Sequence, residues 1–198
     1  MTHIIELQER DYKILDDIKE FKTVLAEDVA KLYWNDPKIK NSLLCCQKRL
    51  KLLTDNRKLS RTRENTTSSY YYYKGKRPIQ LRHKSLIYKL YVQIATQSDI
   101  QVVKYQTEKE FTDDKGQVLR CDLFLVIKKN EDYIPVICEC NLAHIYKEKY
   151  TYFIQSESYK QYFGGNNPLI IDVTKFSRSI SSIPVRTVRI DEINKLIL

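Results

Sequence analysis

The sequence predicts an α+β protein with two domains, residues 1–78 and 79–198. Two observations support this fold class. Apolar residues recur at helical spacing three times near the N-terminus and are followed by a strand pair, whereas after residue 100 the pattern alternates as in strands. A chain of 198 residues with 42% hydrophobic content is long enough to bury two modest cores.

The first domain begins with three amphipathic helices. The first spans residues 7–21, and the second starts after Thr23, the expected N-cap, and ends near Pro37. The third runs from about residue 40 to residue 53. Its predicted buried stripe contains Leu43, Cys46, Leu50 and Leu53, while its outward face carries Asn41, Leu44, Cys45, Lys48 and Lys51.

A β-hairpin follows the third helix. Its predicted arms are residues 59–63 and 70–74, and its polar tip is residues 64–69. In the run from Tyr70 to Tyr73, alternate rings are expected to pack on the core. Three helices and a hairpin form the order of a winged helix-turn-helix domain, in which the third helix enters the major groove and the hairpin lies against the DNA backbone.

The distribution of charge favours double-stranded DNA as the partner. Residues 38–82 contain 13 basic and 2 acidic side chains, so this segment is more positive than the whole chain, which carries +9. The candidate DNA-binding residues are Asn41, Lys48, Arg49, Lys51, Arg61, Arg63 and Lys74. The alternatives are an ordinary solvated face and a winged helix that binds another protein.

The second domain is predicted to be an α/β sandwich. A helix is expected over residues 83–98, and three strands over residues 101–111, 119–128 and 133–141. A long helix over residues 146–162 ends at Gly164 and Gly165, which have the position of a C-cap. Two further strands are expected at residues 169–173 and 185–190.

Two acids lie inside apolar strands of this domain. Asp122 and Glu139 belong to strands that are expected to be neighbours, and a carboxylate in an apolar strand is costly unless it is paired or liganded. If the two side chains converge, they form the beginning of a divalent-metal site for phosphodiester hydrolysis.

Glu110, the run Arg120-Cys121-Asp122 and the run Glu139-Cys140-Asn141 resemble the core of the PD-(D/E)XK nuclease superfamily. The resemblance implies that Asp122 and Glu139 bind Mg²⁺ and that a lysine at position 141 activates water. Asn141 stands there instead, and Cys121 replaces the usual proline. Nearly the whole chain resembles the replication-relaxation family of plasmids and mobile elements, which joins a winged helix to a nuclease-like domain that commonly lacks the lysine. This resemblance is carried by the pattern Lys48, Arg49, Leu50 and Leu53, by the wing, and by the strands of Asp122 and Glu139.

This resemblance implies a degenerate nuclease domain with no cofactor, in which the vestigial site residues are Glu110, Asp122, Glu139 and Asn141. Lys147 or Lys149 is a candidate migrated lysine, which would make the domain a Mg²⁺-dependent, restriction-like endonuclease. Alternatively, Arg120 and Asn141 hold the two acids as a buried polar cluster. A zinc site of Cys121, Cys138, Cys140 and His144 has no typical ligand spacing.

The expected function is sequence-specific binding of double-stranded DNA in the replication, copy control, transfer or transcriptional regulation of a plasmid, phage or other mobile element. A homodimer and a replication or transfer protein are the expected partners. There is no apolar stretch of about 18 residues or signal peptide, and the five cysteines suggest no disulfide framework. We therefore expect a cytoplasmic protein, associated with nucleoid or plasmid and not with a membrane.

Overall fold

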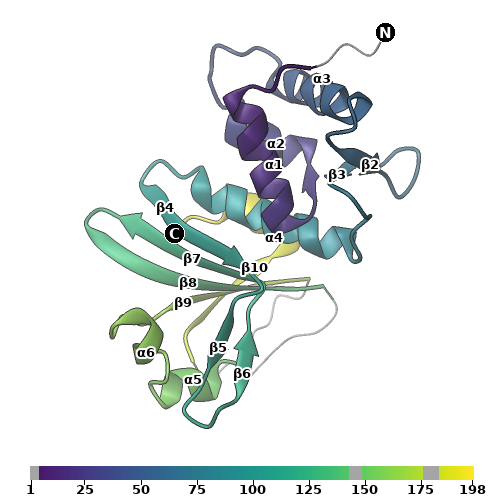
Figure 1. Ribbon diagram of the computed structural model, residues 1–198. Coiled ribbons are helices and arrows are strands. Elements are labelled where there is room, and N and C mark those ends of the chain that lie inside the picture. The colour runs from purple at the N-terminus through teal and green to yellow at the C-terminus, as the bar shows by residue number, and fades with distance from the viewer. Residues whose placement is uncertain (1–4, 143–148, 176–182) are drawn as a thin grey trace. The chain divides into compact units, whose positions relative to one another are not determined.

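In the computed structural model, residues 5–142, 149–175 and 183–198 are described, and they form an α+β fold, as predicted. The chain divides into two compact units, residues 1–92 and 93–198 (Figure 1). The sequence placed this boundary at Pro78. The boundary instead lies within α4 (Leu81–Ala95), because Tyr88 and Tyr91 each pack on Phe21 with ring centroids 5.0 Å apart, which ties most of α4 to the first unit.

The three predicted N-terminal helices are present as α1 (Glu9–Phe21), α2 (Ala26–Tyr33) and α3 (Ser42–Asp55). Thr23 is not the N-cap of α2, since Leu25 has that position. The Thr23 hydroxyl instead donates a hydrogen bond to the Tyr72 carbonyl oxygen at 3.1 Å, which fastens the chain before α2 to the hairpin.

The hairpin is confirmed as β2 (Ser60–Thr62) paired antiparallel with β3 (Tyr71–Tyr73). A two-residue strand, β1 (Val24–Leu25), also pairs with β3, so the sheet order is β1-β3-β2. The sequence did not predict β1, because two residues are too short to show strand alternation.

Two expectations about burial in the first unit are wrong. Leu43 is 42% exposed, so the buried stripe of α3 consists of Cys46, Leu50 and Leu53. Tyr71 and Tyr72 are both buried, although neighbouring residues in a strand point to opposite faces. The reason is that β3 is the central strand and is covered on both faces: Tyr72 lies on the Cys46 side and Tyr71 on the Arg82 side.

The second unit is built on a five-stranded sheet with the order β10-β9-β8-β7-β4. β4 (Ile100–Thr107), β7 (Leu123–Lys129) and β8 (Asp132–Asn141) form an antiparallel meander. β9 (Leu169–Thr174) and β10 (Val185–Arg189) continue it in parallel, and the 3₁₀ helix η1 (Ile190–Lys195), which was not predicted, follows β10.

Two expected strands are each divided in the structure. The end of the strand predicted over residues 101–111 and the start of the strand predicted over residues 119–128 form a separate hairpin, β5 (Glu110–Thr112) and β6 (Val118–Arg120). The division occurs at Glu108, which has a positive φ of 52°, and at Cys121 and Asp122, which lie between β6 and β7. This hairpin therefore leaves the main sheet immediately beside Asp122.

The long helix predicted over residues 146–162 is wrong within the described residues. Two short helices, α5 (Thr151–Gln155) and α6 (Lys160–Phe163), are separated at Glu157, whose φ of 59° is left-handed and cannot continue a helix. The predicted C-cap is present at Gly164, which has a φ of 59° and donates its N–H to the Lys160 carbonyl at 3.1 Å.

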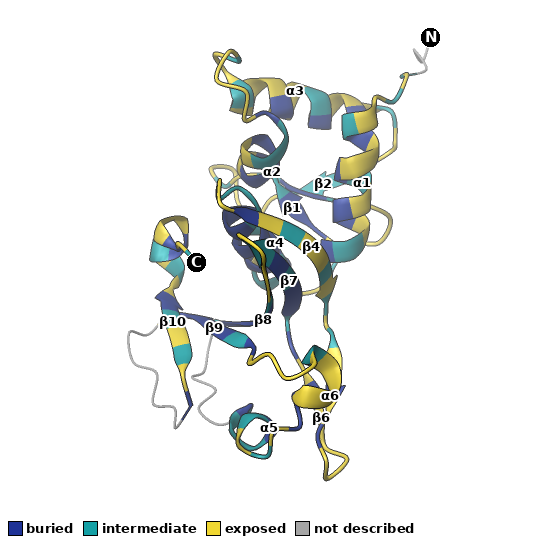
Figure 2. Cartoon of the chain, turned by 90° about the vertical axis from the view of Figure 1, so that its left-hand side faces the viewer, coloured by how far each residue is buried: buried dark blue, intermediate teal, exposed yellow. Residues whose placement is uncertain are grey.

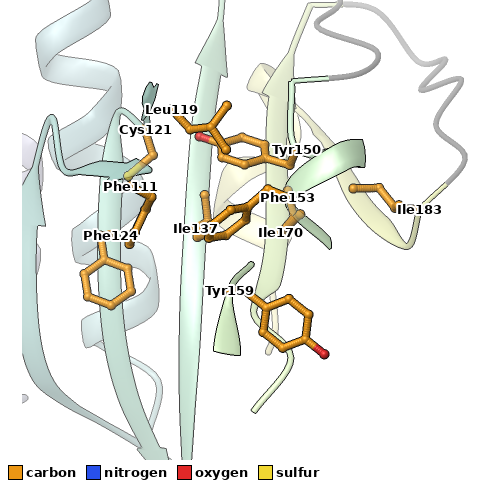
Figure 3. Close-up of a cluster of buried hydrophobic side chains, with 10 residues drawn as sticks. All are labelled: Phe111, Leu119, Cys121, Phe124, Ile137, Tyr150, Phe153, Tyr159, Ile170 and Ile183. Carbon is orange, nitrogen blue, oxygen red and sulfur yellow. The ribbon is translucent and has the colours of Figure 1, made fainter. Parts of the chain in front are cut away.

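One apolar cluster joins these pieces to the sheet (Figure 3). The Phe111 ring lies 5.5 Å from Phe124 of β7 and 5.7 Å from Phe153 of α5, so the hairpin, the sheet and α5 share a core. In Figure 2, β8 and β9 are coloured as buried over most of their length. Tyr150 belongs to this cluster and directs its hydroxyl to Glu139, so the apolar packing positions the polar site described below.

Candidate nucleic-acid interface and carboxylate cluster

A groove of about 430 Å³ lies between α3 and the hairpin of the first unit. Lys48 and Lys51 line it from α3, and Arg61 lines it from β2, so cations project from both sides. Ala26 and Leu43 contribute apolar surface. The partial exposure of Leu43 is explained by its place in this groove rather than in the core.

Tyr70 holds two of the predicted DNA-binding arginines. The Arg61 guanidinium lies 4.4 Å from the centre of the Tyr70 ring, and that of Arg63 lies 5.1 Å from it. Arg63 also donates Nη1 to the Thr66 carbonyl at 2.8 Å. Both guanidinium groups are therefore restrained before any ligand binds.

The hairpin tip is internally ordered by Asn65. Its Oδ1 accepts hydrogen bonds from the backbone N–H and hydroxyl groups of both Thr67 and Ser68, at 2.6 to 3.1 Å. The acid of the hairpin, Glu64, is paired with Arg82, whose Nε lies 2.8 Å from its carboxylate oxygens. The hydroxyl residues of the tip line the groove, and the negative charge of Glu64 is neutralised by Arg82.

The remaining predicted contacts differ in availability. Lys48 and Lys74 are exposed, and within the described ranges neither has an ion pair. Lys51 forms an exposed ion pair with Asp55 at 2.6 Å. An exposed pair contributes little free energy, so Lys51 can leave Asp55 for another anion at small cost. Asn41 is the exposed N-cap residue of α3, and its side chain makes no capping hydrogen bond.

Arg49 requires a correction. We expected it to contact phosphate, but its guanidinium binds the buried carboxylate of Asp11, with Nε 2.9 Å from Oδ1, and donates Nη2 to the Glu6 carbonyl at 3.0 Å. Burial raises the pKa of Asp11, yet the hydrogen bonds from Arg49 and Gln8 outweigh burial and hold this pKa below its usual value. Arg49 is therefore a structural cation.

Sequence reasoning missed most of the groove. The hydroxyl residues Thr67, Ser68 and Ser69, together with Gln47 and Leu43, were not selected as binding residues, although they line the groove. Tyr70 was expected to be a mainly structural residue. The sequence did show an aromatic residue and two arginines on opposite arms of a short hairpin. Only the register, Arg61↔Tyr72 and Thr62↔Tyr71, indicates which tyrosine lies near the arginines.

In the second unit the structure brings Asp122 and Glu139 together. Asp122 follows β6 and its Oδ2 accepts the backbone N–H of Cys140 at 2.8 Å. Glu139 is 6% exposed and lies opposite Asp172 in the β8–β9 register. A third acid, Asp172, therefore lies beside Glu139 on the neighbouring strand. It was missed although it, too, is an acid in an apolar strand.

Lys149 is the described lysine at this cluster. Its Nζ lies 2.8 Å from Glu139 Oε1 and also donates to the Arg120 carbonyl, while the Tyr150 hydroxyl donates to the same carboxylate oxygen. Burial raises the pKa of Glu139 to about 7, against the attraction of Lys149 and with the repulsion of Asp122. The other candidate, Lys147, lies outside the described residues.

The partners expected for a buried polar cluster are wrong. The Arg120 guanidinium pairs with Glu108 and not with Asp122 or Glu139. Asn141 donates Nδ2 to Asp172 Oδ1 at 2.6 Å, so it stabilises the acid that the sequence analysis missed. The acid Glu110 lies in β5, exposed and opposite Arg120 in the register, apart from the interactions that hold Glu139.

The described residues do not fit a metal ion as they are arranged. Across residues 5–142, 149–175 and 183–198, no three Asp, Glu, His or Cys side chains are grouped to hold one. Glu139 instead binds the ammonium of Lys149. Burial raises the pKa of the Cys121 thiol to about 12 and raises those of Cys138 and Cys140, which does not favour zinc-binding thiolates, and His144 lies outside the described residues.

None of the described helices has the length and apolar character needed to cross a lipid bilayer. Comparisons of the chain with protein-family models, with curated proteins and with solved structures find no match. The family resemblance therefore rests on the residues quoted for it.

Proposed function

We propose that the first unit is a winged helix-turn-helix domain that binds double-stranded DNA sequence-specifically. The order α1, β1, α2, α3, β2, β3, with an antiparallel sheet of three strands, supports this assignment. The 14 residues of α3 form a rod about 21 Å long, and a helix of this kind fits the major groove of B-form DNA.

The single observation that carries the proposal is the groove lined by cations from α3 and from the hairpin. On an ordinary solvated face, the cations need not point toward one another. Cations that face each other across a groove can bind a phosphate backbone from two sides. Lys48, Lys51, Arg61, Arg63 and Lys74 remain the proposed phosphate contacts, and Asn41 and Lys48 are the proposed contacts to bases.

The second unit is proposed to be an inactive nuclease-like domain that mediates homodimerisation or holds a replication or transfer protein. Its antiparallel meander continued by parallel strands, with Asp122 immediately before β7 and Glu139 on the adjacent β8, supports the nuclease-like fold. Asn141 at the position of the family lysine, bound to Asp172, supports inactivity. The protein would act in replication, copy control, transfer or transcriptional regulation of a mobile element.

DNA binding is tested by selecting fragments from a random duplex pool and then measuring affinity for a selected duplex at several salt concentrations. Lys48→Ala and Arg61→Ala should each weaken binding and flatten the salt dependence by roughly one unit of slope per lost phosphate contact. Lys13→Ala, which alters a cation paired with Glu9 on α1, is the control. Unchanged slopes in both groove variants would refute the proposal.

A second candidate function is a Mg²⁺-dependent endonuclease, and the observation that favours it is the ion pair of Lys149 with Glu139. Lys149 places a lysine beside an acid of this cluster, whereas position 141 has Asn in place of the lysine. This candidate predicts nicking or cleavage of plasmid DNA that is lost in Asp122→Ala. If intact protein cleaves nothing in the presence of Mg²⁺ or Mn²⁺, the candidate is eliminated.

A further inference from the structure

We infer that the groove between α3 and the hairpin holds the sugar–phosphate backbone of one strand of the duplex, and that Tyr70 is the residue that positions Arg61 and Arg63 for it. This inference rests on the proposed function and assigns one part of the DNA to one part of the surface. It also gives a role to Tyr70, which contacts both arginines and lines the groove.

Apart from the acid Glu27, the lining of the groove matches the chemistry of a sugar–phosphate chain. Phosphate oxygens require cations and hydroxyl donors, which Lys48, Arg61 and the Ser69 hydroxyl supply, since the hydroxyls of Thr67 and Ser68 donate to Asn65. The apolar face of a deoxyribose requires apolar contact, which Leu43 and the Tyr70 ring supply. A simple polyanion would use the cations and leave the apolar surface in contact with water.

The geometry of Tyr70 explains how the two arginines are held. One ring attracts two guanidinium groups, at 4.4 and 5.1 Å from its centre, although the groups carry the same charge. Arginine has five N–H donors, so a guanidinium held over a ring still has donors for a phosphate. Because each side chain is restrained in advance, it loses less conformational freedom when the DNA binds.

The hairpin tip supports the same arrangement from the other side. Asn65 fixes Thr67 and Ser68 through four hydrogen bonds, and Arg63 is tied to the Thr66 carbonyl. Arg63 is therefore held between the tip and Tyr70. The two arginines, the ring and the tip form a unit whose geometry depends on Tyr70 being aromatic.

The test compares Tyr70→Phe with Tyr70→Leu in the full-length protein. Phenylalanine keeps the aromatic face, so affinity for a selected duplex should stay within about twofold of the parent. Leucine keeps apolar bulk and removes the π system, so affinity should fall about tenfold through two lost cation–π contacts. Tyr12→Leu, at an exposed tyrosine on α1, is the matched control and should bind as the parent does.

A positioning role is separated from a structural one by repeating the substitution in Arg61→Ala/Arg63→Ala protein. If Tyr70 acts through the arginines, Tyr70→Leu should add less than twofold loss there. An equal loss in both backgrounds, or an equal loss in Tyr70→Phe, would overturn the positioning role. Thermal unfolding of each variant shows whether it is folded.

The ligand is tested by competition at equal phosphate concentration. Unlabelled duplex should displace labelled duplex at much lower concentration than inorganic polyphosphate does, because polyphosphate has no sugar to contact Leu43 and Tyr70. Equal displacement by polyphosphate would overturn the assignment of a sugar–phosphate backbone. Parent-like binding by Tyr70→Leu with weak binding by Arg61→Ala would defeat this inference alone, whereas absence of duplex binding in the parent would defeat the proposed function.

Discussion

Arg49 of α3 binds Asp11 of α1, with the guanidinium Nε 2.9 Å from the carboxylate Oδ1. Asp11 is almost fully buried and also accepts the backbone N–H of Gln8 at 2.8 Å, within the capping box of α1. The pair therefore fixes the proposed recognition helix to the helix that precedes it. Two neighbouring cations, Lys48 and Arg49, thus have different roles, because the first is exposed and the second is bound internally.

Arg49→Ala should destabilise the first unit by about 3 kcal/mol, since it leaves the buried Asp11 carboxylate without its cation. Lys48→Ala, the adjacent control, should change stability by less than about 0.5 kcal/mol. The salt dependence of DNA binding should show the reverse order, with a change in Lys48→Ala and none in Arg49→Ala. Urea unfolding and binding titrations measure the two effects, and a flattened salt slope in Arg49→Ala would contradict the assignment.

This pair should also make stability depend on pH on the acid side. The pKa of Asp11 in the folded protein lies below the ordinary value of 3.8, so the folded state binds its proton less readily than the unfolded state does. The contribution is therefore complete above about pH 4 and is lost as pH falls further. Unfolding measured at pH 7 and pH 3 should show a larger difference between parent and Arg49→Ala at pH 7.

Asp28 should have the opposite pH dependence. Burial, together with the charge of Glu27, raises its pKa from 3.8 to about 7, against the attraction of Lys89 and Lys31, and its Oδ2 has no hydrogen-bond partner in the described part of the chain. The folded state then binds more protons than the unfolded state between about pH 4 and 7, so stability declines as pH rises through this window.

Asp28→Asn should consequently stabilise the protein by on the order of 2 kcal/mol at pH 8 and have little effect at pH 4. The exposed Asp16→Asn is the control, because it removes the same charge without relieving burial. Chemical unfolding of both variants at the two pH values measures this. A gain of the same size at pH 4 and pH 8 would rule out titration of Asp28 as the cause.

Asp55→Asn should increase affinity for duplex DNA about twofold, because it releases Lys51 from its 2.6 Å ion pair and leaves the cation available in the groove. Asp16→Asn again matches the change in net charge at a position outside the groove lining. The gain should shrink with added salt. Equal gains in the two variants would attribute the effect to net charge alone.

Phe111→Ala should destabilise the second unit by about 3 to 5 kcal/mol, because it removes a fully buried ring that contacts Phe124, Phe153 and Phe163. Phe111→Leu keeps most of the volume and should cost clearly less. Hydrogen exchange across β7 and α5 provides the measurement. A loss under 1 kcal/mol in Phe111→Ala would show that the hairpin of β5 and β6 contributes little to this core.

Local patterns predicted elements whose signal is contained in neighbouring residues. The helices α1 and α3 show apolar periodicity, and the β2–β3 hairpin combines β-forming arms with a polar tip, so all three were predicted near their observed bounds. The long helix over residues 146–162 failed because apolar spacing does not reveal a backbone break such as the positive φ of Glu157. Strand β1 was not predicted because its two residues are too few to show alternation and its partner, β3, is distant in the sequence.

The candidate sites were likewise predicted in part from the sequence and in part only from the structure. Composition and spacing were sufficient to locate a basic helix and hairpin and to select Asp122 and Glu139 as costly acids in apolar strands. They could not assign partners: Asp11 for Arg49, Asp172 for Asn141, Lys149 for Glu139 and Tyr70 for two arginines all follow from contacts between separate elements.

By itself, the amino-acid sequence determined the fold class, most of the helices and strands, and the location of the positive charge. Tertiary structure decided which cations face the groove between α3 and the hairpin, and which acid receives each donor. The physical reason is range: backbone hydrogen bonding and periodicity act between residues close in sequence, whereas burial, ion pairing and pKa shifts depend on neighbours that folding brings together.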